Sequence, residues 1–332
     1  MVSMRDVAAV ARVSYKTVSR VHNNDPNVAE ATRKRVQDAL DQLGYLPNTL
    51  ATTFRDGRSP VIVVAVPDLG DPYFSAIVRR VDHLAAAQEM LTVVAGIGEN
   101  PANERVRIEA LLSRRVSGLI VAPVGDDQSY LLPWARQTPM VFIDRRPSHL
   151  AADSFTTDDD GGGYEVTTHL VGHGHRDIAF LGDSPQVPTS ADRLAGYARA
   201  LARAGLPVRP ELVAWDGATR SGAAAAIKRL RDAADPPTAI FSSNARCTIA
   251  LAPLWHDLGM AVVSFGDFPM SDVLVPSVTV LDQDPARLGE LALARLLDRI
   301  AHPTRRYRRR EVLPATLVER DSCRRPASAG RA

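Results

Sequence analysis

The chain has 332 residues, of which 45% are hydrophobic, and a formal net charge of +2. This length can supply two or three domains with apolar cores. The small net charge excludes a chain that is polycationic throughout, and the basic run from Arg305 to Arg310 is more typical of a solvated turn than of a nucleic-acid contact. With no apolar run of 18 residues and no leader-like segment after Met1, we expect a cytoplasmic protein with no membrane partner.

The first 23 residues predict two short helices joined by a tight turn. Apolar residues recur at helical spacing on both sides of a break at Val13-Ser14. Ser3 can cap the first helix and Ser14 the second, and the second helix then buries Val18 and Val21. A plain helical hairpin would show the same spacing, but a polar outer face also suits the DNA major groove, as in a helix-turn-helix. That outer face carries Tyr15, Lys16, Ser19 and Arg20.

The segment from Met4 to Asn23 resembles, almost residue for residue, the DNA-binding headpiece of the LacI/GalR family of bacterial repressors. The resemblance continues through a third helix over Val28–Gly44 and through the sequence YLPN at 45–48. It implies that three side chains read operator bases and that four others contact phosphates. The base readers are Tyr15, Lys16 and Arg20, and the phosphate contacts are Ser14, Thr17, Ser19 and Asn23.

Residues 48–54 (NTLATTF) resemble the family's hinge helix, which folds when two protomers lie side by side on DNA. The resemblance places Asn48 and Ala51 in this hinge, with Ala51 small enough for close packing. Phe54 matches the leucine that the family wedges into the minor groove, although it would also suit a residue packed in its own core. Ala29 departs from the family, which commonly has a capping serine there.

Two successive blocks of alternating apolar strands and helices follow residue 60. Near-continuous apolar strands are typical of parallel sheets covered on both faces. The fold class is therefore α/β, with a three-helix headpiece and two doubly wound parallel-sheet lobes. In the first block we expect strands at 61–67, 90–95, 118–123 and 140–144, with helices at 72–88, 103–115 and 129–137. In the second we expect strands at 178–181, 212–215, 238–243 and 261–265, with helices ending at 171 and spanning 191–204, 221–233 and 247–258.

A late helix at 285–300 and a strand near 312–317 remain. The family's core resembles periplasmic binding proteins, in which the chain crosses back between lobes to use such pieces. This resemblance implies a headpiece at 1–47, a hinge and linker at 48–60, a core at 61–323 and a frayed tail at 324–332. Lobe one then comprises about 61–157 and 285–312, and lobe two about 158–284 and 313–323.

In this fold a ligand lies where the carboxyl ends of the strands of both lobes face each other. Several strand ends and loops resemble the family's ligand-contacting motifs, among them DLGDPYF at 68–74 and RLAGY at 193–197. The resemblance implies an effector site, for a sugar-like or nucleoside-like molecule, built from Tyr73, Phe74, Asp144, Arg193, Asn244 and Asp267.

The cleft also departs from the family pattern. Ala245 and Gly266 replace usual aspartates, and Gly217 and Pro285 stand where some sugar-responsive members have aromatic residues. These losses indicate either a changed or less polar ligand, or weakened effector control. The second interpretation would make the chain an effector-independent repressor with a degenerate cleft.

Catalytic and metal motifs are weak. The run DDDGGG at 158–163 lacks the Lys-Ser/Thr of a phosphate-binding loop and suits an acidic helix N-terminus. His169 and His173 have the i, i+4 spacing of a metal pair, but we interpret the segment as a helix C-terminal turn. Cys247 and Cys323 lie far apart in the sequence and indicate neither a disulfide nor a zinc site. We expect no enzyme activity, no cofactor and no metal.

The sequence therefore predicts a homodimeric transcriptional regulator, most simply a repressor, with a palindromic double-stranded DNA operator and a small-molecule effector as partners. A solute-binding protein would share the core but would need an export signal and would lack the helix-turn-helix.

Overall fold

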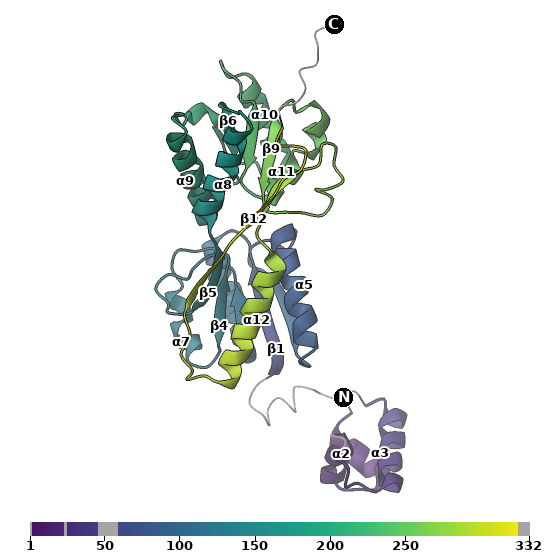
Figure 1. Ribbon diagram of the computed structural model, residues 1–332. Helices are drawn as coiled ribbons and strands as arrows, with labels where there is room; N and C mark the ends of the chain where they lie inside the picture. The colour runs from purple at the N-terminus through teal and green to yellow at the C-terminus, as the bar shows by residue number, and fades with distance from the viewer. Residues whose placement is uncertain (1, 23–24, 46–58, 325–332) are drawn as a thin grey trace. The chain divides into compact units, whose positions relative to one another are not determined.

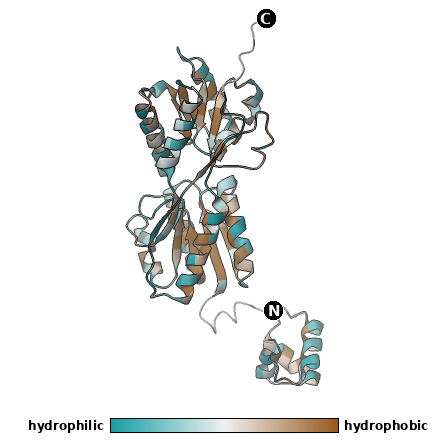
Figure 2. Cartoon of the chain, viewed as in Figure 1, coloured by the Kyte–Doolittle hydropathy of each residue, from teal (hydrophilic) through white to brown (hydrophobic). Residues whose placement is uncertain are grey.

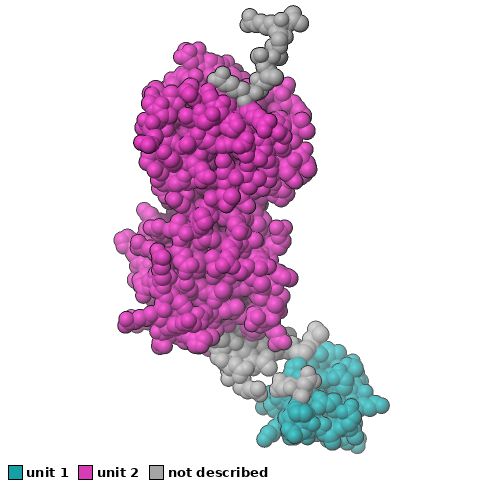
Figure 3. Space-filling view, in the orientation of Figure 1, with its two compact units in different colours: residues 1–58 teal, residues 59–332 magenta. Residues whose placement is uncertain are grey.

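The computed structural model describes residues 2–22, 25–45 and 59–324. The chain forms two compact units, Met1–Arg58 and Ser59–Ala332, which are coloured separately in Figure 3. Residues Asn23, Asn48, Ala51 and Phe54, for which we predicted DNA contacts, lie outside the described residues, as does the predicted tail from 325 onward. No helix in the described part of the chain combines the length and the apolar composition needed to cross a bilayer.

The N-terminal unit consists of three helices, as the sequence predicted. Its first helix begins with a reciprocal cap in which Ser3 and Asp6 each accept a hydrogen bond from the other's backbone N–H. The Ser14 hydroxyl caps the second helix by accepting a hydrogen bond from the Thr17 N–H at 3.1 Å. Val18 and Val36 are fully buried in the shared core. The helices are α1 (Met4–Ala11), α2 (Tyr15–His22) and α3 (Glu30–Leu43).

The third helix begins without a side-chain cap. Ala29 is the N-cap residue, with φ −56° and ψ 138°, and no side chain accepts a hydrogen bond from the first turn. The other end is regular, because Gly44 adopts the left-handed conformation (φ 56°) and closes the helix.

Replacing Ala29 by serine should therefore stabilise this unit by about 1 kcal/mol, because a serine hydroxyl satisfies a backbone N–H of the first turn. The measurement is amide hydrogen exchange of α3 in the full-length chain, where protection should increase several-fold. An Ala29→Val variant, which adds bulk without a hydroxyl, should not increase it. Equal protection in the serine and valine variants would contradict the prediction.

The C-terminal unit contains two six-stranded sheets, each covered by helices on both faces (Figure 1). The strand order is β11-β5-β4-β3-β1-β2 in lobe one and β12-β10-β9-β8-β6-β7 in lobe two. All strand pairs are parallel except the antiparallel pair of β10 and β12. The predicted α/β fold class is thus confirmed.

The first sheet is built from β1 (Ser59–Val66), β2 (Leu91–Gly96), β3 (Val116–Val121), β4 (Met140–Ile143), β5 (Asp153–Thr157) and β11 (Arg310–Leu313). The helices of this lobe are α5 (Pro72–Ala86), α6 (Pro101–Leu112), the 3-10 helix Ser129–Leu131, α7 (Leu132–Ala135) and α12 (Pro285–Ala301). The second sheet is built from β6 (Ile178–Leu181), β7 (Val213–Ala214), β8 (Ala239–Ser242), β9 (Ala261–Phe265), β10 (Thr279–Asp282) and β12 (Thr316–Val318). Its helices are α8 (Asp159–Gly172), α9 (Pro188–Arg203), the 3-10 helix Pro210–Leu212, α10 (Arg220–Arg231), α11 (Ala245–Ala250) and the 3-10 helix Ala252–Asp257.

The apolar strands form the centre of each lobe, where Figure 2 shows them brown between helices with hydrophilic outer faces. Every residue of β3, β4, β8 and β9 is buried. Burial on both faces of a parallel sheet explains why these segments read as unbroken apolar runs rather than as an alternation.

Three strands and one helix differ from the sequence prediction. The strands β5 and β10 were not predicted. β5 (DSFTT) is polar in composition, although all its residues are buried. The single strand expected near 312–317 is two strands that belong to different sheets. The α-helix expected at 247–258 ends at Ala250, and the chain continues as the 3-10 helix Ala252–Asp257, which has Pro253 in its first turn. Within residues 59–324 the chain passes between the sheets three times, after β5, after β10 and between β11 and β12.

Candidate DNA-binding surface and effector cleft

The second helix of the N-terminal unit presents the predicted polar face to solvent. Tyr15 is 55% exposed at the first turn, and Lys16 next to it is exposed as well. Val18 and Val21 are buried on the opposite face, so the helix is fixed by its apolar side and its polar side is available. Thr17 and Ser19 are half-buried at the margin of this face. The arrangement is that of a recognition helix in a helix-turn-helix.

Arg20 is held by an ion pair that the sequence analysis did not predict. Its Nε lies 2.8 Å from Oδ2 of Asp25, in the loop that follows the helix. The hydrogen bond from Arg20 and a second one from the Asn27 N–H lower the pKa of Asp25 to about 2. To contact a base edge or a phosphate, Arg20 must therefore either use the nitrogens that do not bind Asp25 or break the ion pair with Asp25.

The structure brings five of the six predicted effector residues to one pocket between the lobes. Tyr73 and Phe74 come from α5, and Asp144 follows β4, all in lobe one. Arg193 comes from α9 and Asn244 follows β8, in lobe two.

The sixth predicted residue, Asp267, does not join the residues that line this pocket. Its carboxylate instead accepts hydrogen bonds from Arg320 at 2.9 Å and from Ser271. The two residues before it, Phe265 and Gly266, do line the pocket.

Arg193 is placed by unusually close packing of α8 against α9. A Cβ at Gly163 would lie 2.3 Å from the Arg193 carbonyl oxygen, and one at Gly196 would lie 2.0 Å from that of Asp160. Both glycines therefore allow the two backbones to touch. The Arg193 side chain is almost fully buried, contacts Asp159 at 2.7 Å and donates to the Ser243 carbonyl at 2.6 Å.

The guanidinium of Arg193 also stacks on Phe265, 3.9 Å from the ring centroid. The contacts with Asp159, Ser243 and Phe265 together fix the guanidinium in one position. A ligand that contacts it would find a rigid, pre-oriented cation.

Carboxylates crowd the pocket on both sides. Asp144 has a positive φ of 65° and forms an ion pair with Arg145 at 3.3 Å. Burial raises the pKa of Asp159, against the opposing effect of Arg193. Burial also raises the pKa of Asp71 to about 6, and Asp144 and Asp68 add to that increase. The pKa of Tyr73 lies well above its ordinary value, first because of burial and then because of Asp144 and Asp159.

The raised pKa of Asp71 predicts a pH-dependent stability. A carboxyl with a pKa of 3.8 in the unfolded chain and about 6 in the folded one destabilises the fold above pH 6 and leaves it unaffected below about pH 4. Asp71→Asn removes the charge, and asparagine can still cap α5 as Asp71 does through the Tyr73 N–H. The variant should be more stable than the parent at pH 7.5, by up to about 3 kcal/mol, and equally stable at pH 4.

Thermal unfolding across this pH range measures the effect, with the exposed Asp126→Asn as the matched control. The control should leave the difference between pH 4 and pH 7.5 unchanged. If the parent loses no more stability than Asp71→Asn between pH 4 and pH 7.5, the pKa of Asp71 is not raised by the fold.

Arg246 connects the two lobes and was not predicted from the sequence. It stands on α11 in lobe two, and its Nη1 lies 3.0 Å from Asp68 and 3.2 Å from Glu99 of lobe one. Its other nitrogens approach Asp71 at 4.0 Å and Asp183 at 3.8 Å. The sequence could have indicated Asp183 as a pocket residue, because it lies just after the end of β6, as Asp144 lies just after the end of β4. No spacing rule identifies Arg246, because its partners come from three separate loops.

The pocket is narrow in this conformation, with space of about 40 Å³. Ligand pockets for small molecules typically measure about 300–1,000 Å³. The space in this conformation is therefore too small for a sugar or a nucleoside.

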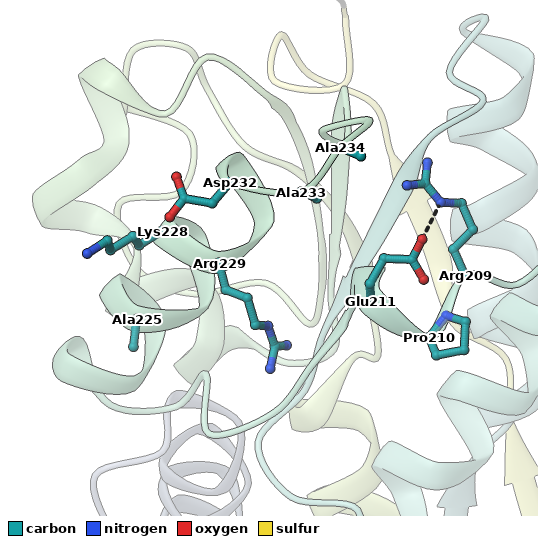
Figure 4. Close-up of a pocket in the computed structure, with 9 residues that line it drawn as sticks. All are labelled: Arg209, Pro210, Glu211, Ala225, Lys228, Arg229, Asp232, Ala233 and Ala234. Carbon is teal, nitrogen blue, oxygen red and sulfur yellow. Dashed lines mark hydrogen bonds and ion pairs between the residues drawn. The ribbon is translucent and has the colours of Figure 1, made fainter.

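A larger surface pocket of about 700 Å³ lies elsewhere on lobe two, between α10 and the 3-10 helix Pro210–Leu212 (Figure 4). Arg209 and Glu211 form an ion pair at 2.9 Å on one side, and Arg229 and Asp232 stand on the other. None of the predicted effector residues lines it. Its volume alone does not make it the effector site, because its side chains do not converge at the carboxyl ends of the strands.

Comparisons with known proteins agree with this geometry. Residues 3–48 match the bacterial regulatory proteins of the lacI family, and residues 167–323 match the periplasmic binding protein-like domain. The chain is 28% identical to the HTH-type transcriptional repressor PurR of Photobacterium profundum, over 96% of this chain and 98% of the relative.

Solved structures show the same likeness. The lac repressor dimer bound to operator and the anti-inducer ONPF superimposes with a TM-score of 0.82 at 28% identity, covering 97% of this chain and 99% of that one. The complex of the transcriptional regulator CelR with cellobiose gives a TM-score of 0.69 at 26% identity, covering 97% and 100%.

A helix-turn-helix unit followed by a two-lobed core with a cleft between the sheets defines a ligand-responsive DNA-binding regulator. The chain belongs to the LacI/GalR family of bacterial transcriptional regulators. It is a DNA-binding transcriptional repressor and, like its relatives, not an enzyme.

Proposed function

We propose that the protein binds a palindromic DNA operator as a homodimer in the cytoplasm. We further propose that a hydroxyl-rich metabolite, of the sugar or nucleoside class, binds in the cleft between the lobes and controls this binding.

The exposed face of α2 carries the DNA proposal. Tyr15 and Lys16 project from its first turn, where a recognition helix reaches furthest into the major groove. In this proposal Tyr15, Lys16 and Arg20 read base edges, since lysine and arginine donate to guanine O6 and N7. The phosphate contacts are Ser14, Thr17, Ser19 and Asn23, and the hinge residues Asn48, Ala51 and Phe54 act at the operator centre.

The mixture of charges in the cleft supports the effector class. Carboxylates of Asp71, Asp144 and Asp183 line the pocket together with Arg193 and Phe265. Converging acceptors and donors next to an aromatic face suit a ring that carries hydroxyl groups. Ala245 and Gly266 replace aspartates that are usual in the family, and the cleft loses two carboxylates as a result. Asp71 and Asp183 provide hydrogen-bond acceptors in their place.

The two lobes give the control a physical basis. A ligand shifts the equilibrium between open and closed lobes only by its difference in affinity for the two states. Ion pairs from Arg246 to Asp68 and Glu99 already favour closure in the absence of ligand. An effector that separates these groups, or replaces their contacts, changes the orientation of lobe one, to which the hinge segment is joined.

One observation favours a second candidate, a repressor that needs no effector. Several polar groups of the cleft bind one another, since Arg193 binds Asp159 and Asn244 both donates to Asp183 and accepts from the Cys247 N–H. The Tyr73 hydroxyl is an exception and has no hydrogen-bond partner among the described residues. Together with the space of about 40 Å³, this arrangement resembles a cleft that is permanently closed.

The experiment has two arms. Selection of bound sequences from a random DNA library should yield a palindrome, and a half-site of it should bind far more weakly than the full site. Thermal unfolding against a panel of sugars, nucleosides and purines should then identify a ligand that shifts the melting temperature and changes operator affinity. A palindrome without any ligand response establishes the effector-independent repressor, and failure to select any sequence refutes the DNA proposal itself.

A further inference from the structure

Two histidines and a cysteine meet at one point of lobe two, away from the cleft. One ring nitrogen of His169, one of His173 and the Sγ of Cys323 all lie within 4.8 Å of one another. The Sγ is 3.7 Å from His173 Nε2, and the two imidazole centroids are 4.5 Å apart. A carboxylate oxygen of Glu319 lies 3.6 Å from the same His173 nitrogen.

The fold builds this cluster from two distant segments. His169 and His173 are four residues apart at the C-terminal end of α8, so they share one face of that helix. Cys323 follows β12, 150 residues further along the chain. Its segment is held in place because the Thr279 N–H donates to the Ser322 hydroxyl at 2.8 Å and the Ser322 hydroxyl donates to the Val262 carbonyl at 2.6 Å.

One polar atom of the cluster is left without a partner, although the Cys323 thiol donates to the Arg320 carbonyl oxygen at 3.4 Å. His169 Nε2 is buried and has no hydrogen-bond partner among the described residues. A buried polar atom of this kind is uncommon and calls for an unseen partner such as a water or an ion.

We propose that His169, His173, Cys323 and Glu319 bind one Zn²⁺ ion. One thiolate, two imidazoles and one carboxylate are a donor set typical of zinc, whose bonds of about 2.3 Å to sulfur and 2.0 Å to nitrogen place tetrahedral ligand atoms about 3.5 Å apart. Cys323 and Glu319 are near that separation from His173 already. The Glu319 carboxylate is not among the three ligand groups that lie within 4.8 Å of one another, so its side chain must turn toward His169 and Cys323 to complete the site.

Four protein ligands leave no open position, so this is a structural site and not a catalytic one. The ion ties the segment after β12, which follows the last of the three passages between the lobes, to helix α8 (Figure 1). Binding displaces the proton of the Cys323 thiol. The site is independent of the effector cleft and of the DNA-binding face, so its test needs neither ligand nor operator.

The test uses the untagged full-length protein, titrated with Co²⁺ and then with Zn²⁺. One equivalent of Co²⁺ should give the visible absorption of a tetrahedral site and a near-ultraviolet band from thiolate-to-cobalt charge transfer, and Zn²⁺ should abolish both. Cys323→Ser should lose the charge-transfer band although Cys247 remains. His173→Gln, at a half-buried position, and Glu319→Gln, at an exposed one, should each weaken Zn²⁺ binding, the histidine variant by tenfold or more.

His256→Gln, which removes an exposed histidine outside the cluster, is the matched control and should bind as the parent does. Because the buried Cys323→Ser variant can lose stability, melting temperatures are measured with and without Zn²⁺. Zn²⁺ should raise the melting temperatures of the parent and of His256→Gln. It should raise the melting temperature of His173→Gln far less. The proposal is overturned if the parent binds no equivalent of either metal, or if His173→Gln and Cys323→Ser bind them as tightly as the control.

Discussion

The Lys16→Ala variant is expected to bind its operator about 10- to 100-fold more weakly and to discriminate less between operator and unrelated DNA. Lys16 is exposed in the first turn of α2, where it can donate to the edge of a base, and such a contact contributes about 1–3 kcal/mol of discrimination. The measurement is affinity for the selected palindrome, for single-base variants of it and for random duplex, at one fixed salt concentration.

Lys34→Ala is the matched control, because it removes the same charge from an exposed position on α3. It should weaken all sequences alike and only slightly, by the loss of a long-range attraction to phosphates. If Lys16→Ala lowers operator and random-duplex affinity by the same factor, Lys16 contacts only the backbone and is removed from the base-reading set.

The Arg193→Ala variant should lose stability as well as effector response. Truncation leaves the buried Asp159 carboxylate and the Ser243 carbonyl without the guanidinium that now contacts both. Breaking a buried ion pair on one side typically costs about 3–5 kcal/mol. We therefore expect a fall of this size in the free energy of unfolding, measured by chemical denaturation, and a weakening of the effector response by tenfold or more.

A second substitution separates the two effects. Asp159→Asn in the Arg193→Ala background removes the unpaired charge and should recover a large part of the lost stability. It should not recover the effector response, because the cation that faces the cleft is still missing. If the double variant regains both, Arg193 acts only through the stability of lobe two and is not a ligand contact.

Much of this protein was predictable from local sequence patterns. The capping residues Ser3 and Ser14 and the valines at 18 and 21 specify the two helices and also which face is outward, because capping and amphipathic spacing act over one or two turns. The apolar runs of β3, β4, β8 and β9 likewise identify parallel strands buried on both faces. The resemblance then placed Tyr73, Phe74, Asp144, Arg193 and Asn244 at one cleft, and the structure brings them together there.

Other features depended on contacts between distant segments. β5 is polar in sequence and becomes a buried strand only because it pairs between β4 and β11. The chain at 310–318 contributes to two different sheets, and its short apolar pattern does not show where one strand ends and the next begins.

The polar clusters show the same division most clearly. Asp267 matched a family motif, but its carboxylate is taken by Arg320, which lies 53 residues away. Arg246 bridges the lobes through acidic residues of three loops, and Cys323 lies beside two histidines that precede it by about 150 residues. The sequence by itself determined most of the helices and strands and the class of protein, because helix capping and apolar periodicity are local. Only the tertiary structure decided which charged and sulfur-bearing side chains meet, because their partners are set by how the two sheets and the returning chain pack.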